Sequence, residues 1–233
     1  GDDLVNITGA GADAAASWNI IYGNDGNDTV GGSAATTGQI IAYGGSGNDL
    51  LYGGNATQDI LYGGEGADTI YALGTGADVV YGDAGADVLY GAVSGGTVFG
   101  GEGNDSIFDG YGSGAKTATT PATLSGGEGA DEFSFDSNDV TAAFSVGAVG
   151  AMTFTVIADF TRGTDVISLY SIFTSTLTPA LSNASISVAA TDQITWTVDG
   201  SDTRVIVAGN SSEYIMLNLT GVTTLALTDF EIL

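Results

Sequence analysis

The residues of this chain that are best suited to chemistry are aspartates that recur in short glycine-rich segments. Residues 44–52 read GGSGNDLLY and residues 63–71 read GGEGADTIY. Both are nonapeptides of the form GGxGxDxUx, where U is a large aliphatic residue. The glycines let the backbone turn tightly with its carbonyl oxygens accessible, and the aspartate adds a carboxylate. Calcium takes about six to eight oxygen ligands of these two kinds, so the pattern predicts calcium sites.

Most other site chemistries are disfavoured by the composition. The chain has no His and no Cys, which disfavours zinc and excludes Ser-His-Asp and Cys-His nucleophilic sites. Magnesium is disfavoured because it prefers a tighter octahedron that keeps several waters. The irregularly placed acids Asp136, Asp139, Asp192 and Asp202 form no recognisable pair for acid-base catalysis. We therefore expect that this chain is not an enzyme.

The charge balance points to cations as partners. The formal net charge is -25, with only three basic residues. Nucleic acids and anionic membrane surfaces would repel such a chain, so we expect neither as a partner. The 43% hydrophobic content and mean hydropathy of +0.24 argue against disorder, which implies that the charge must be neutralised. Without cysteines for disulfides, bound metal is the expected stabiliser.

No segment predicts membrane insertion or a leader. No apolar run approaches the roughly 18 residues of a membrane span, and no signal peptide opens the chain. The chain starts within a repeat remnant, GDDLV, which suggests a fragment of a longer protein.

The repeat also predicts the elements that position the aspartates. If the glycine pair is numbered 1 and 2, positions 1 to 6 form a turn and positions 7 to 9 form a short strand whose position 8 faces inward. Such strands are stable only when coils stack at about 4.8 Å. Two repeats make one coil of about 18 residues. The predicted inward residues are Ile21, Val30, Leu51, Leu61, Ile70, Val80, Leu89, Val98, Ile107 and Phe133.

Turns two repeats apart should form two rows. The first row keeps Gly at position 4 and Asp at position 6, and its aspartates are Asp13, Asp28, Asp49, Asp68, Asp87, Asp105 and Asp131. The second row has lost most carboxylates; it runs Asp3, Asn19, Gln39, Asp59, Asp78, Gly96 and an insertion from Asp109 to Thr123.

Aromatic residues recur at the outward end of the strands. They are Tyr22, Tyr43, Tyr52, Tyr62, Tyr71, Tyr81, Tyr90, Phe99 and Phe108. We expect stacked columns that reinforce the sheets; the alternative is a surface that binds a partner.

Glycine usage predicts a boundary near residue 134. Of the 38 glycines only six follow Ser134. We assign residues 1–134 to the repeat domain and 135–233 to a β-rich cap, a sandwich or a continued roll with longer strands. Strands are expected at 152–157, 185–188, 194–198, 203–207 and 214–219, a loop at Pro179, and a short turn within 165–173.

The repeat region resembles the RTX calcium-binding β-roll family. The resemblance covers residues 1–134, with near-consensus repeats starting at Gly44, Gly63, Gly82, Gly100 and Gly126. It implies an all-β, right-handed parallel β-roll followed by a β-rich cap. It also implies ions held by the carbonyls of positions 2 and 4 and the Asp of one turn, together with the carbonyls of positions 1 and 3 and the Asp of the next turn in the row.

Carried over residue by residue, this scheme gives the expected ligands. They are Gly9, Gly11, Asp13, Gly23, Asn24, Asp25, Gly26, Asp28, Gly44, Gly45, Ser46, Gly47, Asp49, Gly63, Gly64, Glu65, Gly66, Asp68, Gly82, Asp83, Ala84, Gly85, Asp87, Gly100, Gly101, Glu102, Gly103, Asp105, Gly126, Glu128 and Asp131. We expect about six Ca2+ ions in the first row and few in the second, with one between Asp59 and Asp78.

The C-terminal part resembles the segment that follows such repeats in type I secretion substrates. Residues 157–169, IADFTRGTDVISL, are similar to an IxDFxxGxDxIxL motif, and the ending LTDFEIL is similar to uncleaved export signals of that family. Asp159 and Asp165 either bind a further calcium or cap turns.

Two functions follow from these resemblances. The first is a calcium-triggered folding module at the C-terminus of a secreted bacterial protein, with the type I secretion machinery as its export partner. The second is a self-associating segment of a surface-layer protein or adhesin at the cell surface.

Overall fold

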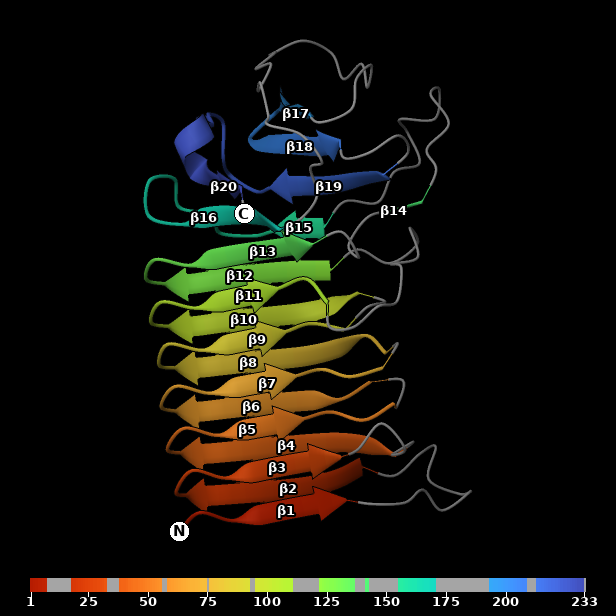
Figure 1. Cartoon of the computed structure of the whole chain (residues 1–233), viewed down its shortest axis with the longest axis vertical. Coiled ribbons are helices and arrows are strands. Elements are labelled where there is room, and N and C mark those ends of the chain that lie inside the picture. Colours follow the sequence, from red (N-terminus) through yellow and green to blue (C-terminus); the bar gives the residue numbers. More distant parts are fainter. Residues whose placement is uncertain are drawn as a thin grey trace.

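Two β-sheets run the length of the molecule and face each other, with successive coils stacked from the N-terminus to the C-terminus (Figure 1). The computed structural model describes residues 1–7, 18–32, 38–55, 58–74, 76–92, 95–110, 122–136, 141–142, 155–170, 193–208 and 213–232. Within these ranges there is one short 3-10 turn, η3 (Leu227–Asp229), and no α-helix. No helix in these ranges has the length and apolar character needed to cross a membrane.

The first sheet contains the short strands that follow the aspartate turns. In the described residues its order is β1 (Leu4–Ile7), β3 (Thr29–Gly32), β5 (Leu50–Tyr52), β7 (Thr69–Tyr71), β9 (Val88–Tyr90), β11 (Ser106–Phe108), β13 (Glu132–Asp136), β16 (Val166–Tyr170) and β20 (Phe230–Ile232). All neighbours are parallel. The predicted parallel β-roll is therefore confirmed.

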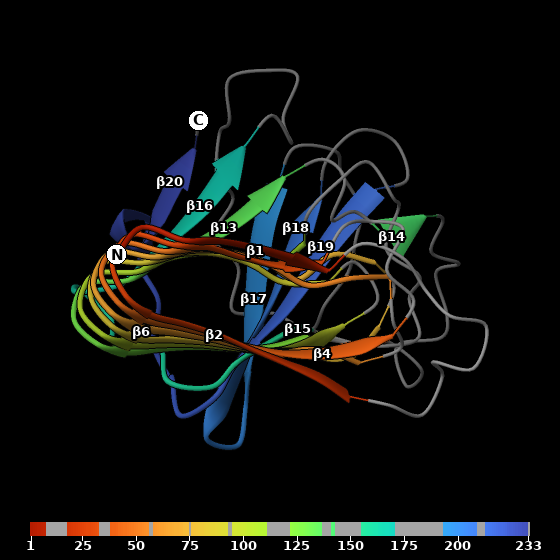
Figure 2. The same cartoon turned by 90° about the horizontal axis from the view of Figure 1, so that it is seen from below.

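The second sheet contains the strands that precede the same turns. Its described members run β2 (Trp18–Asp25), β4 (Gln39–Ser46), β6 (Ile60–Glu65), β8 (Asp78–Ala84), β10 (Gly96–Glu102), β12 (Ala122–Glu128), β15 (Thr155–Ile157), β19 (Glu213–Leu219), β18 (Asp202–Ala208) and β17 (Gln193–Asp199), and β14 (Thr141–Ala142) pairs with β19. Viewed along the stack, the two sheets are layers joined by superimposed turns (Figure 2).

One aliphatic or aromatic side chain per short strand fills the space between the sheets. All ten predicted inward residues are buried, with Ile21 the most exposed at 5%. Ile40, Ala42 and Leu124 join the same core. A three-residue strand buries a single large side chain, so the core depends on stacking of coils.

Outward aromatic side chains form two stacked columns, as predicted. In the second sheet Tyr22, Tyr43, Tyr62, Tyr81 and Phe99 stack with ring centroids 4.7 to 5.0 Å apart. In the first sheet Tyr52, Tyr71, Tyr90 and Phe108 stack at 4.5 to 5.3 Å. Ring separation matches the strand spacing because the strands are in register.

Both sheets continue past residue 134. β12 pairs with β15 and β13 pairs with β16, both parallel, and β17, β18 and β19 then form an antiparallel extension. The domain division at residue 134 stays a prediction. The expected strands at 194–198, 203–207 and 214–219 are confirmed, and β15 covers the end of the strand expected at 152–157.

The short turn expected within 165–173 was wrong for Val166–Tyr170, which is strand β16, and residues 171–173 lie outside the described residues. In β16 the side chains Ile167 and Leu169 alternate into the core, and this period of two outweighed the local turn signal. The strand expected at 185–188, Pro179 and most of the insertion from Asp109 to Thr123 lie outside the described residues.

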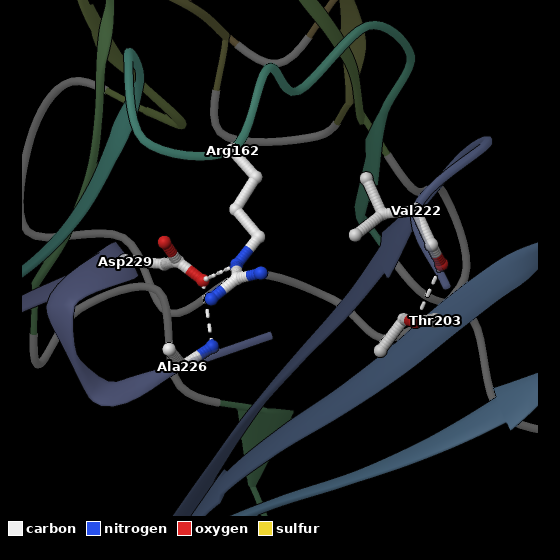
Figure 3. A network of polar contacts seen from close by, with 5 residues as sticks. All are labelled: Arg162, Thr203, Val222, Ala226 and Asp229. Atoms are coloured by element: carbon white, nitrogen blue, oxygen red, sulfur yellow. Dashed lines mark hydrogen bonds and ion pairs between the residues drawn. The ribbon is translucent and has the colours of Figure 1, made fainter. Parts of the chain in front are cut away.

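An ion pair joins the turn between β15 and β16 to the 3-10 turn η3. Arg162 Nε, in the turn between β15 and β16, donates to Oδ2 of Asp229 in η3 at 3.0 Å, and the backbone nitrogen of Ala226 donates to the same oxygen at 2.6 Å (Figure 3). Nearby, the Thr203 hydroxyl donates to the Val222 carbonyl at 2.6 Å. These contacts hold β20 beside β16 as the last strand of the first sheet.

Candidate metal centre

Glycine is required in the turns of the first row because neighbouring coils approach closely. Gly47 has φ of 125°, and a Cβ built on it would collide with the carbonyl oxygen of Gly26 in the preceding coil. Gly66 repeats the arrangement with φ of 124° and the carbonyl of Gly47. Positive φ and this contact both exclude larger residues. The stacked turns therefore place carbonyl oxygens of consecutive coils next to each other.

The aspartates of these turns form a continuous chain of hydrogen bonds between coils. We call Asp28, Asp49, Asp68, Asp87, Asp105 and Asp131 the acidic ladder. In each step the backbone nitrogen of one aspartate donates to Oδ1 of the next; the distances are 2.7, 2.7, 2.8, 2.9 and 3.0 Å. One carboxylate oxygen per residue is thus committed to the stacking of the coils.

The other oxygen of every ladder residue is buried without a partner. Oδ2 of all six aspartates accepts no hydrogen bond within the described part of the chain, and the residues are 1 to 3% exposed. Buried carboxylate oxygens are normally hydrogen-bonded or bound to a metal. A column of six such atoms is suited to binding cations.

The space beside each Oδ2 is left open by a glycine at position 1. A Cβ on Gly63 would meet Oδ2 of Asp68 and, at 2.6 Å, the carbonyl oxygen of Gly82. Gly82 has the same relation to Asp87 and to the Gly100 carbonyl. Gly23, Gly44 and Gly100 repeat it, so five such spaces are each bounded by a carboxylate and a carbonyl oxygen of the following turn. Calcium ligands are oxygens of these two kinds, and the donor set fits this ion.

The position 3 carbonyls, also expected as ligands, each accept a hydrogen bond. The nitrogen of Gly47 donates to the carbonyl of Glu65 at 2.8 Å, and the nitrogen of Gly66 donates to that of Ala84. A carbonyl oxygen has two lone pairs, so this bond leaves one for a cation. The side chains of Glu65, Glu102 and Glu128 are exposed, and only their backbones belong to the turns.

Ionisation of the ladder carboxylates is unfavourable in this buried, crowded setting. Burial, together with the charges of neighbouring carboxylates, raises the pKa of Asp68 to about 6 and that of Asp87 to about 7. Burial and, after it, the charge of Asp131 raise the pKa of Asp105 to about 6. A divalent cation would reverse this penalty because opposite charge favours the ionised form.

The prediction that Asp3 belongs to the second row was wrong. Its backbone nitrogen donates to Oδ1 of Asp28 at 2.6 Å and β1 pairs with β3, so Asp3 precedes Asp28 in the first row. Counting about 18 residues per coil misplaced Asp3, because 25 residues separate it from Asp28. The predicted members Gly9, Gly11 and Asp13 lie outside the described residues.

The second row differs in geometry from the first. Ile40, not Gln39, holds position 6, since its nitrogen donates to Oδ1 of Asp59 at 2.8 Å. The nitrogen of Asp59 donates to Oδ1 of Asp78 at 2.7 Å, and the nitrogen of Gly54 donates to Oδ2 of Asp59 at the same distance. Of Asp59 and Asp78, only Asp78 has a buried Oδ2 without a hydrogen-bond partner. The ion expected between these two residues stays a prediction.

Asp165 extends the ladder by one coil, which counting of glycines had missed. The nitrogen of Asp131 donates to Oδ1 of Asp165 at 3.2 Å, and the nitrogen of Thr161 donates to Oδ2 of Asp165 at 2.6 Å. The signal lay in the sequence: Asp165-Val166-Ile167 has the D-x-U form of the repeats.

Asp159 caps the last glycine turn. Its Oδ1 accepts a hydrogen bond from the nitrogen of Gly126, and its Oδ2 accepts bonds from the Ser125 hydroxyl and the nitrogen of Gly127, at 2.7 to 3.0 Å. These contacts support the capping alternative for Asp159, and calcium at Asp159 and Asp165 stays a prediction.

Side chains alone do not build a metal site here. In the ranges that the structure describes, no three His, Cys, Asp or Glu side chains cluster closely enough to hold an ion. Backbone carbonyls must supply most ligands, as the glycine-bounded spaces allow.

Comparison with known families decides the identity of these turns. The family described as RTX calcium-binding nonapeptide repeat (4 copies) matches residues 16–35, 41–70, 73–93 and 95–113. The chain contains RTX repeats. RTX nonapeptide repeats bind calcium, so the acidic ladder belongs to a calcium-binding β-roll.

This chain is similar to the solution structure of the AlgE6R3 subunit from the Azotobacter vinelandii mannuronan C5-epimerase. The sequence identity is 24% and the TM-score 0.38, over 79% of this chain and 80% of the subunit. No curated protein sequence matches the chain.

Proposed function

We propose that this chain is a calcium-triggered folding module of a bacterial protein exported by type I secretion. The observation that supports it best is the column of six buried Oδ2 atoms without partners, each beside a glycine turn. Folding brings these carboxylates together at about the strand spacing, which is unfavourable until their charge is neutralised. Bound calcium supplies that neutralisation.

The energies involved are large enough to control folding. A site stabilises the folded state by about 1.4 kcal/mol when free calcium is tenfold above its Kd, so six sites contribute roughly 8 kcal/mol. Whole domains are stable by about 5–15 kcal/mol. Extracellular calcium modules bind with Kd of about 0.1–1 mM, so the module stays unfolded at cytosolic calcium and folds outside the cell.

Secretion fits the C-terminal segment. The residues that resemble an export signal include β20, which pairs with the motif strand β16 only in the folded state. In an unfolded chain this segment would be free to engage the export machinery. We propose a secreted or surface location on this basis.

We further infer a binding role without catalysis. The regularly placed carboxylates are committed to the ladder, and the chain has no His or Cys. Asp202 is the one irregular acid whose side chain the structure describes; it is half-buried and accepts hydrogen bonds from Ser201 and Gly221. An alternative function is self-association, for which the stacked aromatic column on the outer side of the second sheet offers a regular apolar surface.

The test is a calcium titration of the purified chain, followed by far-UV circular dichroism. We expect a weak β-sheet signal in chelator and a cooperative gain in the millimolar calcium range, with calorimetry reporting several ions per chain. Asp68→Ala with Asp87→Ala should shift the transition to higher calcium, and Glu231→Gln, an exposed acid on β20, should not. Equal β-sheet signals in chelator and in calcium would refute the proposal.

A further inference from the structure

Four tyrosines stack in one continuous column on the outer side of the second sheet. They are Tyr22 on β2, Tyr43 on β4, Tyr62 on β6 and Tyr81 on β8, and neighbouring ring centroids are 5.0, 4.9 and 4.7 Å apart. Neighbouring ring planes differ by only 3 to 6°. Because the strands are also in register, equivalent carbons of neighbouring rings lie about as far apart as the ring centroids. The carbons ortho to the phenol oxygens therefore form a column of their own.

The phenol groups of this column are accessible and lie close to one another. Tyr22 is 58% exposed, and the other three tyrosines are half-buried. Burial, then the phenol groups of Tyr81 and Tyr43, then the carboxylate of Asp83 raise the pKa of Tyr62, so its hydroxyl stays protonated at neutral pH. Accessible side chains change rotamer within nanoseconds, which brings neighbouring rings transiently closer than their resting separation.

We propose that the column is a site of oxidative cross-linking, at which a one-electron oxidant joins neighbouring tyrosines as dityrosine. The oxidant takes one electron from each of two neighbouring phenols, and each phenol releases its proton to water. The two phenoxyl radicals couple by forming a carbon–carbon bond between ortho carbons. The hydrogen on each of these carbons then moves to the phenol oxygen, which restores both aromatic rings. Two tyrosines thus give one dityrosine, two protons and two electrons, and two equivalents of the oxidant accept the electrons.

The fold favours coupling within the column over other fates of the radicals. A radical on Tyr62 has a second phenol on each side, with the ring centroids of Tyr43 and Tyr81 at 4.9 and 4.7 Å. Groups that a fold holds side by side react as if they were at very high concentration. The chain also has no Cys, a residue whose thiol oxidants attack readily. Neighbouring tyrosines are therefore the favoured partners of each radical.

The product is a covalent link between coils. A bond between Tyr43 and Tyr62 joins β4 to β6, and a bond between Tyr62 and Tyr81 joins β6 to β8. Links between residues far apart in the sequence lower the entropy of the unfolded chain, as disulfides do. The inference goes beyond the proposed function because it concerns bonds that calcium does not form. It requires the folded roll, in which the tyrosines are stacked.

The experiment is photo-oxidation of the purified chain in millimolar calcium with a ruthenium tris-bipyridyl complex and persulfate, which together act as a one-electron oxidant. A low micromolar protein concentration keeps reactions between chains rare, and circular dichroism verifies the β-sheet signal beforehand. The product is then unfolded in chelator and cleaved before aspartate, which places Tyr43, Tyr62 and Tyr81 in separate peptides because aspartates lie between them. Mass spectrometry identifies the linked peptides, since each link lowers the summed mass by that of two hydrogen atoms.

Wild type should yield links within single chains, from Tyr62 to Tyr43 and from Tyr62 to Tyr81. Tyr62→Phe keeps the ring but removes its phenol, so we expect both links to be lost. The matched control is Tyr170→Phe, which also removes one phenol. Tyr170 lies in neither aromatic column, and its hydroxyl donates to Glu132 at 3.0 Å. We expect this control to keep both links.

Phe99→Tyr is a second variant, which extends the column by one phenol. The ring centroid of Phe99 lies 5.0 Å from that of Tyr81, and Phe99 is 36% exposed, so a hydroxyl is accommodated. We expect this variant to gain a link between Tyr81 and position 99.

Three outcomes would overturn the proposal. They are a native β-sheet signal in calcium without links between tyrosines of the column, links only in products of twice the chain mass, and equal loss of links in Tyr62→Phe and the control. Failure of the proposed function has a different signature, because the roll would then fold in chelator and the same links would form with and without calcium.

Discussion

The backbone nitrogen of Asp68 donates a 2.8 Å hydrogen bond to Oδ1 of Asp87 in the next coil. The second oxygen of Asp87, Oδ2, is buried without a partner. The two oxygens of this carboxylate are therefore in different surroundings: Oδ1 joins the coils, and Oδ2 is the oxygen that we propose binds a cation. Variants that separate these roles test the site directly.

Asp87→Asn should separate stacking from cation binding. An asparagine keeps an Oδ1 acceptor for Asp68 but replaces the charged Oδ2 with an amide nitrogen. In chelator we expect a somewhat stronger β-sheet signal than that of the wild type, since a buried charge is lost. In calcium we expect a several-fold higher midpoint in the titration. Asp87→Ala, which removes both roles, should give a weaker β-sheet signal than Asp87→Asn in chelator and a higher calcium midpoint; the reverse order would contradict the assignment.

Gly63→Ala should block one calcium site. Its methyl group would meet Oδ2 of Asp68 and the carbonyl of Gly82, at 2.6 Å from the latter, and backbone must move to admit it. We expect about one ion fewer by calorimetry and a loss of about 1–3 kcal/mol in calcium.

Gly53→Ala is the matched control, at position 1 of the second row. Its Cβ would lie 3.1 Å from Oδ2 of Asp59, its nearest neighbour, and the corresponding residue of the next coil is already Ala72. We expect unchanged calcium stoichiometry. A similar loss of bound calcium in both variants would contradict the site.

Stability should depend on pH in opposite ways with and without calcium. Burial raises the folded-state pKa of Asp87 to about 7, above the unfolded value of about 3.9. Its contribution to the metal-free fold is thus fully present below about pH 4 and lost as pH rises through about 7. We expect the β-sheet signal in chelator to fall between pH 4 and 7.5. The calcium midpoint should instead rise on acidification, because protons compete for the same oxygens; a midpoint independent of pH would contradict this.

Asp83→Gly should stabilise the roll. Asp83 has φ of 72° where neighbouring coils have Gly64 and Gly101, and its charge raises the pKa of both Asp68 and Asp87. A side chain in this conformation costs about 1 kcal/mol relative to glycine. We expect thermal unfolding in calcium to shift upward by a few degrees. A decrease would show that the Asp83 carboxylate itself is needed.

Arg162→Met should weaken the C-terminal end without affecting the ladder. Asp229 is 1% exposed, and its partner Arg162 is 45% exposed. Replacement of Arg162 leaves a buried carboxylate without its cationic partner, and the loss is limited because solvent already screens the exposed guanidinium. We expect a loss of about 1–2 kcal/mol. Hydrogen exchange in β20 should accelerate while calcium stoichiometry stays the same. Unchanged exchange would show that the pair does not hold β20.

Local features of the repeat were predictable because each depends on neighbours within nine residues. Inward Leu61 and outward Tyr62 follow from strand alternation, and the chemistry of the site follows from glycine and aspartate in the same turn. These expectations needed only the order of residues along the chain.

The sequence by itself determined the unit: a glycine turn, one aspartate, one buried side chain and an oxygen-only site for calcium. Only the tertiary structure decided which units are neighbours. Asp3 precedes Asp28, Ile40 takes the place expected for Gln39, and Asp165 follows Asp131. The reason is physical: hydrogen bonds between coils join residues 18 to 34 positions apart, and burial of the core sets their register whatever the length of the intervening loop.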